Sequence, residues 1–186
     1  PWHGLGNQLT RDASIDQWIK DAGMEWTIQS APVLYQAGGA SRTMGNHVVL
    51  HRSDNQFGLS IVTDKFRVVQ PREVLEFFRN LCEHNHFQME TAGTLFGGRK
   101  FWALANIGAE SYVLGKADKV RGRLLLATAC DGSMQTTAKF VAERVVCNNT
   151  LTMAIKESGR AVKVSHRTSF DVTKTQQDLG VGVETF

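Results

Sequence analysis

A thiol and a hydroxyl lie three residues apart in the stretch CDGS, at Cys130 and Ser133. A neighbouring histidine could turn either group into a nucleophile, but the sequence does not identify such a histidine. The carboxylate of Asp131 disfavours the thiolate beside it, and the pair Asp131-Gly132 is typical of a tight hairpin turn. The stretch therefore favours a hairpin turn. A cysteine-dependent enzyme is the alternative.

Three side chains of metal-ligating type, Cys82, His84 and His86, lie close together in the chain. In a helix, ligands two residues apart point to different sides, so the three converge only if the helix ends by His84. No fourth ligand accompanies them. The stretch TLFGGRK combines glycines with a lysine but lacks the strand-loop-helix spacing of a phosphate-binding loop. We expect neither a metal nor another cofactor.

A pattern suited to nucleic acids follows the pair Gly97-Gly98, which predicts a hairpin turn. Alternate residues of the strand after it share a face. The expected core face consists of Phe101, Ala103, Ala105 and Ile107. The expected outer face consists of Lys100, Trp102, Leu104 and Asn106. Trp102 then lies opposite Gly93, where its ring covers the missing side chain. An indole beside a cation can stack on a base, worth about 1 to 3 kcal/mol; packing of Trp102 under a helix is the alternative.

Positive charge is concentrated in the second half of the chain. The net charge is +3, but residues 99–186 carry 13 Lys or Arg against 8 Asp or Glu. Residues 116–167 carry 10 against 4, which predicts a basic stripe that follows a phosphodiester backbone in a salt-dependent way. A mildly basic solvated surface is the alternative. The predicted nucleic-acid-binding residues are Arg99, Lys100, Trp102, Arg121, Arg123, Lys139, Arg144, Lys163 and Arg167.

The helix and strand patterns around these residues predict an α+β fold. It consists of a curved antiparallel β-sheet built from hairpins, with two or three helices on one face. Ser14 caps an amphipathic helix that ends at Gly23, and a second helix follows Pro71. A third helical pattern covers residues 148–159. Strand patterns cover residues 25–35, 47–69 and 161–167, and hairpins turn at 97–98 and 131–132.

Length and composition favour one soluble domain over residues 1–186, which we expect to be the ordered part of a longer chain. The sequence contains no apolar run long enough for a membrane helix and no signal-peptide pattern at its start. The three cysteines are odd in number and form no Cys-x-x-Cys pair. A reducing cytoplasm is the expected location.

Four motifs in order, PWHGLG, TAGTLFGGRKFWALANI, LLLATACDGS and RVVCNNTL, resemble the landmarks of the phage/plasmid-like family that carries domain of unknown function 932. The resemblance covers nearly the whole chain. In that family a histidine often precedes Asp-Gly-Ser, whereas Cys130 stands there in this sequence. The resemblance implies a cytoplasmic protein of mobile elements. Its strand-rich plan is similar to recombination-mediator single-strand annealing proteins, which assemble into rings with a basic groove.

These observations predict sequence-independent binding and annealing of single-stranded DNA in phage or plasmid recombination. We expect a homo-oligomer, a ring or a filament, because a hairpin-rich open sheet has edges that need to be covered. A protein-interaction or anti-defence factor of a mobile element is the alternative from another class, and it would show no affinity for nucleic acid.

Overall fold

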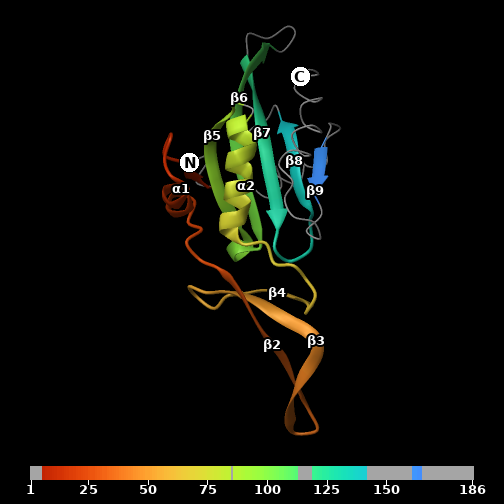
Figure 1. Cartoon of the computed structure of the whole chain (residues 1–186). Coiled ribbons are helices and arrows are strands. Elements are labelled where there is room, and N and C mark those ends of the chain that lie inside the picture. The colour runs from red at the N-terminus through yellow and green to blue at the C-terminus, as the bar shows by residue number, and fades with distance from the viewer. Residues whose placement is uncertain (1–5, 85, 113–118, 142–160, 165–186) are drawn as a thin grey trace.

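The computed structural model describes residues 6–84, 86–112, 119–141 and 161–164, and these form an α+β fold of antiparallel sheets and two α-helices (Figure 1). This confirms the predicted class and its construction from hairpins. The sequence predicted one curved sheet, whereas the described strands are divided between a six-stranded and a three-stranded sheet. Neither described helix is long and apolar enough to cross a membrane.

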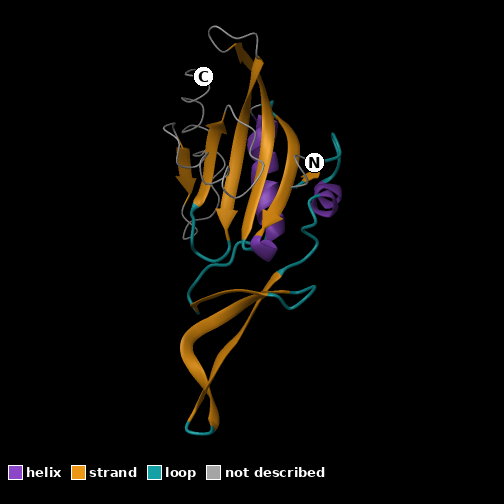
Figure 2. Ribbon diagram, turned by 180° about the vertical axis from the view of Figure 1, so that it is seen from behind, coloured by secondary structure: helices purple, strands orange, loops and turns teal. Residues whose placement is uncertain are grey.

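The six-stranded sheet forms the body of the molecule (Figure 2). Its strand order is β1-β5-β6-β7-β8-β9, and every neighbouring pair is antiparallel. The strands are β1 (Asn7–Gln8), β5 (Gln88–Leu95), β6 (Lys100–Tyr112), β7 (Lys119–Ala129), β8 (Thr136–Val141) and β9 (Ala161–Val164). The short β9 confirms the strand that the sequence predicted from residue 161.

The three-stranded sheet contains β2 (Ile28–Ala37), β3 (Ala40–Arg52) and β4 (Gly58–Thr63), in that order. The hairpin of β2 and β3, with its turn at Gly38-Gly39, projects away from the body (Figures 1 and 2). We call this hairpin, residues 28–52, the arm. The chain between β3 and β4 turns at residues 53–57, as the Ser-Asp-Asn-Gln stretch predicted.

The two helices lie on one side of the six-stranded sheet. The helix α1 (Ile15–Asp21) begins as predicted, because the Oγ of Ser14 accepts a hydrogen bond from the backbone N–H of Gln17 at 3.3 Å. The helix α2 (Pro71–His84) lies over β5 and β6, and α1 packs against α2. The helix predicted at 148–159 lies outside the described residues.

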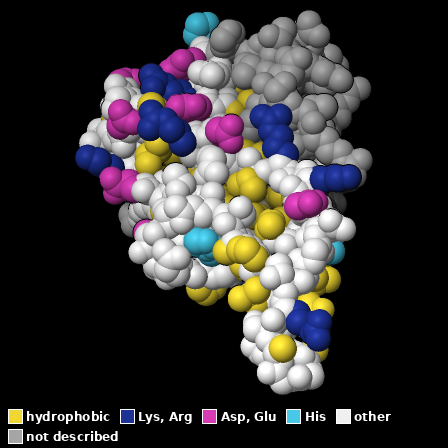
Figure 3. Space-filling model, turned by 60° about the horizontal axis from the view of Figure 1, so that its bottom comes forward, with side chains coloured by type: hydrophobic (Ala, Val, Ile, Leu, Met, Phe, Trp, Pro, Cys, Tyr) yellow, Lys and Arg dark blue, Asp and Glu magenta, His cyan; other side chains and the backbone are white. Residues whose placement is uncertain are grey.

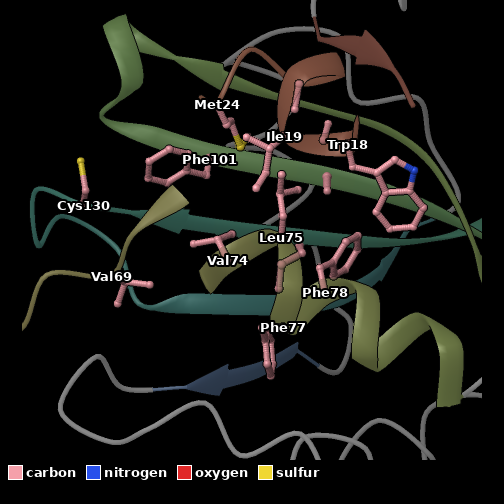
Figure 4. Packing of buried hydrophobic residues seen from close by; sticks show 14 of the residues in the cluster. Trp18, Ile19, Met24, Val69, Val74, Leu75, Phe77, Phe78, Phe101 and Cys130 are labelled. Carbon is pink, nitrogen blue, oxygen red and sulfur yellow. The ribbon is translucent and has the colours of Figure 1, made fainter. Parts of the chain in front are cut away.

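The larger of two hydrophobic clusters among the described residues connects the helices with both sheets. In Figure 4, Leu75 of α2 lies between Phe101 of β6 and Trp18 of α1, and Phe78 of α2 belongs to the same cluster. The same cluster of buried residues includes Trp26, next to the start of β2. The base of the three-stranded sheet and the body are therefore held by continuous apolar packing, while the outer half of the arm lies beyond it.

The second predicted hairpin differs in its register. A two-residue turn at 131–132 would place Ala127 opposite Thr136, but the structure pairs Ala127 with Thr137. The connection runs through residues 130–135 and is longer than a two-residue turn. A shift of one residue moves every side chain of a strand to the other face. The observed register pairs Lys139 with Leu125 and so places it on the sheet face opposite α2.

Candidate nucleic-acid interface

The two faces of β6 divide as the sequence predicted. Phe101, Ala103 and Ala105 belong to the main core under α2, and Trp102 and Leu104 belong to a separate buried cluster on the other face. Trp102 also pairs with Gly93, as expected from the turn at Gly97-Gly98. The alternation and register of this hairpin are therefore confirmed.

The expectation of an exposed ring at Trp102 is wrong. The residue is only 4% exposed. A Cβ added to Gly6 would lie 2.5 Å from Cζ2 of the indole, and one added to Gly93 would lie 2.8 Å from the Cα of Gly6. The indole therefore packs closely on a glycine of the segment before β1. In this conformation the ring cannot stack on a base, and it packs Gly6 against the sheet.

Arg123 is also buried, in contrast to the predicted phosphate contact. Its Nε donates to Oε2 of Glu90 at 2.9 Å, and the Arg123 side chain is 9% exposed. The Nδ2 of Asn106 donates to the other carboxylate oxygen at 3.4 Å. Glu90 lies on β5, Asn106 on β6 and Arg123 on β7, so this polar group connects three adjacent strands. A buried cation held in this way is a structural residue.

The other cations of the predicted stripe are not brought together on an exposed surface of the described residues. Lys139 is 2% exposed. The backbone of Lys163 pairs with Thr137, and that of Arg121 pairs with Glu110, but their side chains are not described. Arg144 and Arg167 lie outside the described residues. The prediction of an exposed basic stripe is therefore wrong at Arg123 and Lys139. It stays a prediction at the other four positions, Arg121, Arg144, Lys163 and Arg167.

Arg99 is exposed and Lys100 is partly exposed, so these two cations are the part of the prediction that the structure places within reach of solvent. Both lie where the loop after β5 enters β6. The Cζ of Arg99 is 5.7 Å from the centroid of the Phe57 ring, and the Nζ of Lys100 is 5.4 Å from that of Phe96. The two phenylalanines are 44% and 53% exposed. Two cations and two accessible rings thus lie at the end of the sheet that faces the arm.

The glycines of TLFGGRK explain how these groups approach one another. Gly97 has φ of +69°, and a Cβ there would lie 2.6 Å from Cε1 of Phe57. A Cβ at Gly98 would lie 2.6 Å from Cη2 of Trp26. Only glycine fits at both positions, because a ring from another part of the chain packs directly on each one. The motif therefore joins the loop after β5 to the base of the arm.

Arg52, the last residue of β3, completes this junction. Its guanidinium lies 4.2 Å from the centroid of the Trp26 ring, and its Nη1 donates to the carbonyl oxygen of Gly97 at 3.0 Å. It also forms an ion pair with Asp54 at 2.6 Å, and this hydrogen bond lowers the pKa of the Asp54 carboxyl. We name Arg52, Phe57, Phe96, Arg99 and Lys100 the junction cluster. Figure 3 shows hydrophobic side chains gathered where the arm meets the body.

The sequence prediction missed Arg52, Phe57 and Phe96 in this cluster. Arg52 and Phe57 flank the turn between β3 and β4, more than 40 residues before Arg99, so no local pattern connects them. Phe96 directly precedes the glycine pair. A large apolar residue at the tip of a predicted hairpin is a signal of exposure that could have been used.

The thiol of Cys130 lies behind the junction cluster. Its Sγ donates to the carbonyl oxygens of Gly98 and Arg99, at 3.4 Å each. Burial raises the pKa of the thiol to about 12, and the Asp131 carboxylate adds to this effect. Burial likewise raises the pKa of the Cys82 thiol. Both groups are poor nucleophiles as they stand, and Cys147 lies outside the described residues.

A cavity of about 520 Å³ lies between Trp18, α2 and the start of β5. The cations at its wall are already engaged: Arg11 donates to Gln88 at 2.6 Å, and Arg79 forms an ion pair with Glu83 at 2.6 Å. Within the described part of the chain, no three His, Cys, Asp or Glu side chains lie close enough together to hold a metal ion. The junction cluster is therefore the strongest candidate site.

Comparison with known families identifies the class of protein. Residues 58–186 match the model of the Domain of unknown function (DUF932). The chain therefore belongs to the DUF932 family. The matched segment contains β4, α2 and the strands β5 to β9, whereas the arm precedes it. No curated protein and no solved structure matches this chain.

Proposed function

We propose that this protein binds single-stranded DNA without sequence preference and promotes pairing of complementary strands in phage or plasmid recombination. The observation that carries the proposal is the junction cluster, in which Arg99 lies over the exposed ring of Phe57 and Lys100 over that of Phe96. Cations beside accessible rings are the combination that holds a phosphate backbone and stacks its bases.

The chemistry of the cluster favours sequence-independent contact. Phosphate contacts by Arg99 and Lys100 would release counterions and carry no sequence information. Every base has a face that can stack on Phe57 or Phe96. Arg52 is held by Asp54 and by the carbonyl of Gly97, so we assign it to supporting the cluster. Arg121, Arg144, Lys163 and Arg167 stay candidates for extending the contact.

Assembly belongs to the same proposal. In the described part of the chain, β2 and β4 are the edge strands of the three-stranded sheet. Unpaired edges favour association with another strand. We propose a cytoplasmic homo-oligomer, a ring or a filament, that aligns several junction clusters along one DNA strand. Sedimentation that shows only a 20.6 kDa monomer at micromolar concentration, with and without DNA, would contradict this assembly.

The test measures fluorescence anisotropy of a labelled single-stranded oligonucleotide over a range of salt concentrations. We expect Arg99→Ala with Lys100→Ala to weaken binding and to reduce the slope of log K against log salt by about 1.4, since each phosphate contact contributes about 0.7. Phe57→Ala with Phe96→Ala should cost about 1 to 3 kcal/mol per stacked base and leave the slope nearly unchanged.

Lys20→Ala is the matched control, because it removes one exposed cation from α1, far from the cluster in sequence. It should bind as the wild type does. Annealing is followed separately by energy transfer between complementary labelled strands. If the folded protein shows no micromolar binding at low salt, the annealing proposal fails and the protein-interaction alternative takes its place.

A further inference from the structure

The outer half of the arm is exposed throughout. Every residue from 34 to 46 is solvent-exposed, including the large side chains of Leu34, Tyr35 and Met44. A two-stranded ribbon without a packed face is marginally stable alone in water. These strands, of 10 and 13 residues, are held by the core only at their base. An arm built in this way is suited to lie along a partner.

The arm has the charge expected for a polyanionic partner. Residues 26–53 contain no Asp or Glu, although the chain has 18 of them in 186 residues. The same stretch contains Arg42, Arg52, His47 and His51. Arg52 is engaged at the junction, so Arg42 is the arginine presented near the tip. An acid-free projection meets no carboxylate repulsion when it approaches phosphates.

The outer half of the ribbon combines a cation, an aromatic ring and a flexible apolar side chain. Tyr35 pairs directly with Arg42 across the two strands. Met44 lies two residues beyond Arg42, where the regular pairing of the two strands is interrupted after Thr43, and it is 43% exposed. The turn at Gly38-Gly39 has positive φ at both positions and adds no side chain to the tip. Proteins that enter the minor groove of DNA use this combination: arginine in the groove and an apolar wedge between base steps.

We propose that the arm lies in the minor groove of double-stranded DNA, with Arg42 in the groove and Tyr35 and Met44 against the sugars and bases. The proposal rests on the proposed annealing function, of which the duplex is the product. It assigns the single strand to the junction cluster and the paired product to the arm. The arm would then hold the newly formed duplex while the next bases pair.

The experiment compares two oligonucleotide probes, a single strand and its blunt duplex, with the full chain. The variant Tyr35→Ser, Arg42→Ser, Met44→Ser changes exposed side chains only, and its thermal unfolding checks that it folds. We expect its affinity for the duplex to fall at least tenfold and its affinity for the single strand to stay within twofold. The control Ile61→Ser removes an exposed apolar side chain from β4, outside the arm, and should change neither.

Two further measurements identify the groove. Netropsin, which occupies the minor groove, should displace the wild type from the duplex, and a 2-aminopurine within the duplex should become brighter as bases unstack. Undiminished binding in the presence of netropsin overturns the proposal. Normal binding of the duplex by the arm variant also overturns the proposal. If that variant in addition has a changed sedimentation coefficient, the arm contacts a second copy of the chain instead of DNA.

The two proposals fail in different ways. Arm-dependent binding of the duplex without any binding of the single strand would support the arm and refute the annealing function. A different result would support the junction cluster and refute the role of the arm. In that case binding of the single strand depends on Arg99 and Lys100, and binding of the duplex is unchanged in the arm variant.

Discussion

Arg123 on β7 forms an ion pair with Glu90 on β5, with 2.9 Å between Nε and Oε2, although β6 lies between these two strands. The contact thus spans the width of three strands. Breaking a buried pair by removing one partner leaves an uncompensated charge, which costs about 3 to 5 kcal/mol when both partners are fully buried. The Glu90 side chain retains 27% exposure, which reduces that cost.

We therefore expect Arg123→Met to lower the free energy of unfolding by about 2 kcal/mol. Chemical denaturation of this variant, of Glu90→Gln and of the double variant forms a mutant cycle that isolates the coupling between the two side chains. The single variants should be non-additive. An Arg123→Met protein with wild-type stability but without DNA binding would contradict the structural role and return Arg123 to the nucleic-acid interface.

The junction depends on the absence of a side chain at Gly97. Gly97→Ala should cost about 1 to 2 kcal/mol for the left-handed backbone, and about 1 to 3 kcal/mol more because the new Cβ meets Phe57. Gly38→Ala is the matched control, since Gly38 also has positive φ but has open space around it. Thermal unfolding should show the larger loss for Gly97→Ala, together with weaker binding of single-stranded DNA. Equal losses would show that Phe57 does not pack tightly there.

The buried thiol of Cys130 makes the free energy of unfolding fall as the pH rises in the alkaline range. Its pKa is raised to about 12 in the folded protein, against about 8.5 in an unfolded chain. Above about pH 8.5 the unfolded state loses this proton while the folded state keeps it, so stability falls as pH rises, by at most about 1.4 kcal/mol per pH unit. Cys130→Ala should show a flatter decline than the wild type in denaturant titrations between pH 8 and 10.

The same burial predicts slow alkylation of the Cys130 thiol. In a Cys147→Ser background, iodoacetamide at pH 7.5 should label Cys82 and Cys130 slowly until denaturant is added, with peptide mass spectrometry as the measurement. Rapid labelling of Cys130 in the folded protein would instead favour the cysteine-dependent enzyme.

Local patterns predicted much of the fold. The alternation of β6, its pairing with β5 and the Ser14 cap depend on neighbouring residues or on one short turn, so the sequence contained the necessary information. The division of the strands between two sheets depends on contacts between distant segments. The one-residue difference at the second hairpin arises because the Asp131-Gly132 pair predicts a two-residue turn, whereas the connection is longer.

The candidate site was harder to predict for a different reason. A polar side chain in a strand normally faces water, so the sequence predicts Arg123 and Lys139 in an exposed stripe. Both are buried on the second face of the sheet. Arg99 and Lys100 were identified, but the rings beneath them come from a turn after β3 and from the loop itself. The arm's Gly38-Gly39 turn lies between two strand-like runs and was a usable signal.

The pairing of β1 with β5 sets an order of events during synthesis. Asn7 pairs with Ala92, so the first strand leaves the ribosome about 85 residues before its partner. At a synthesis rate of roughly 5 to 20 residues per second, β1 has no neighbouring strand for about 4 to 17 seconds. The arm and both helices are made within this interval. The indole of Trp102, which packs on Gly6, emerges later still, so Gly6 and β1 can take their final places only when the middle of the chain has been translated.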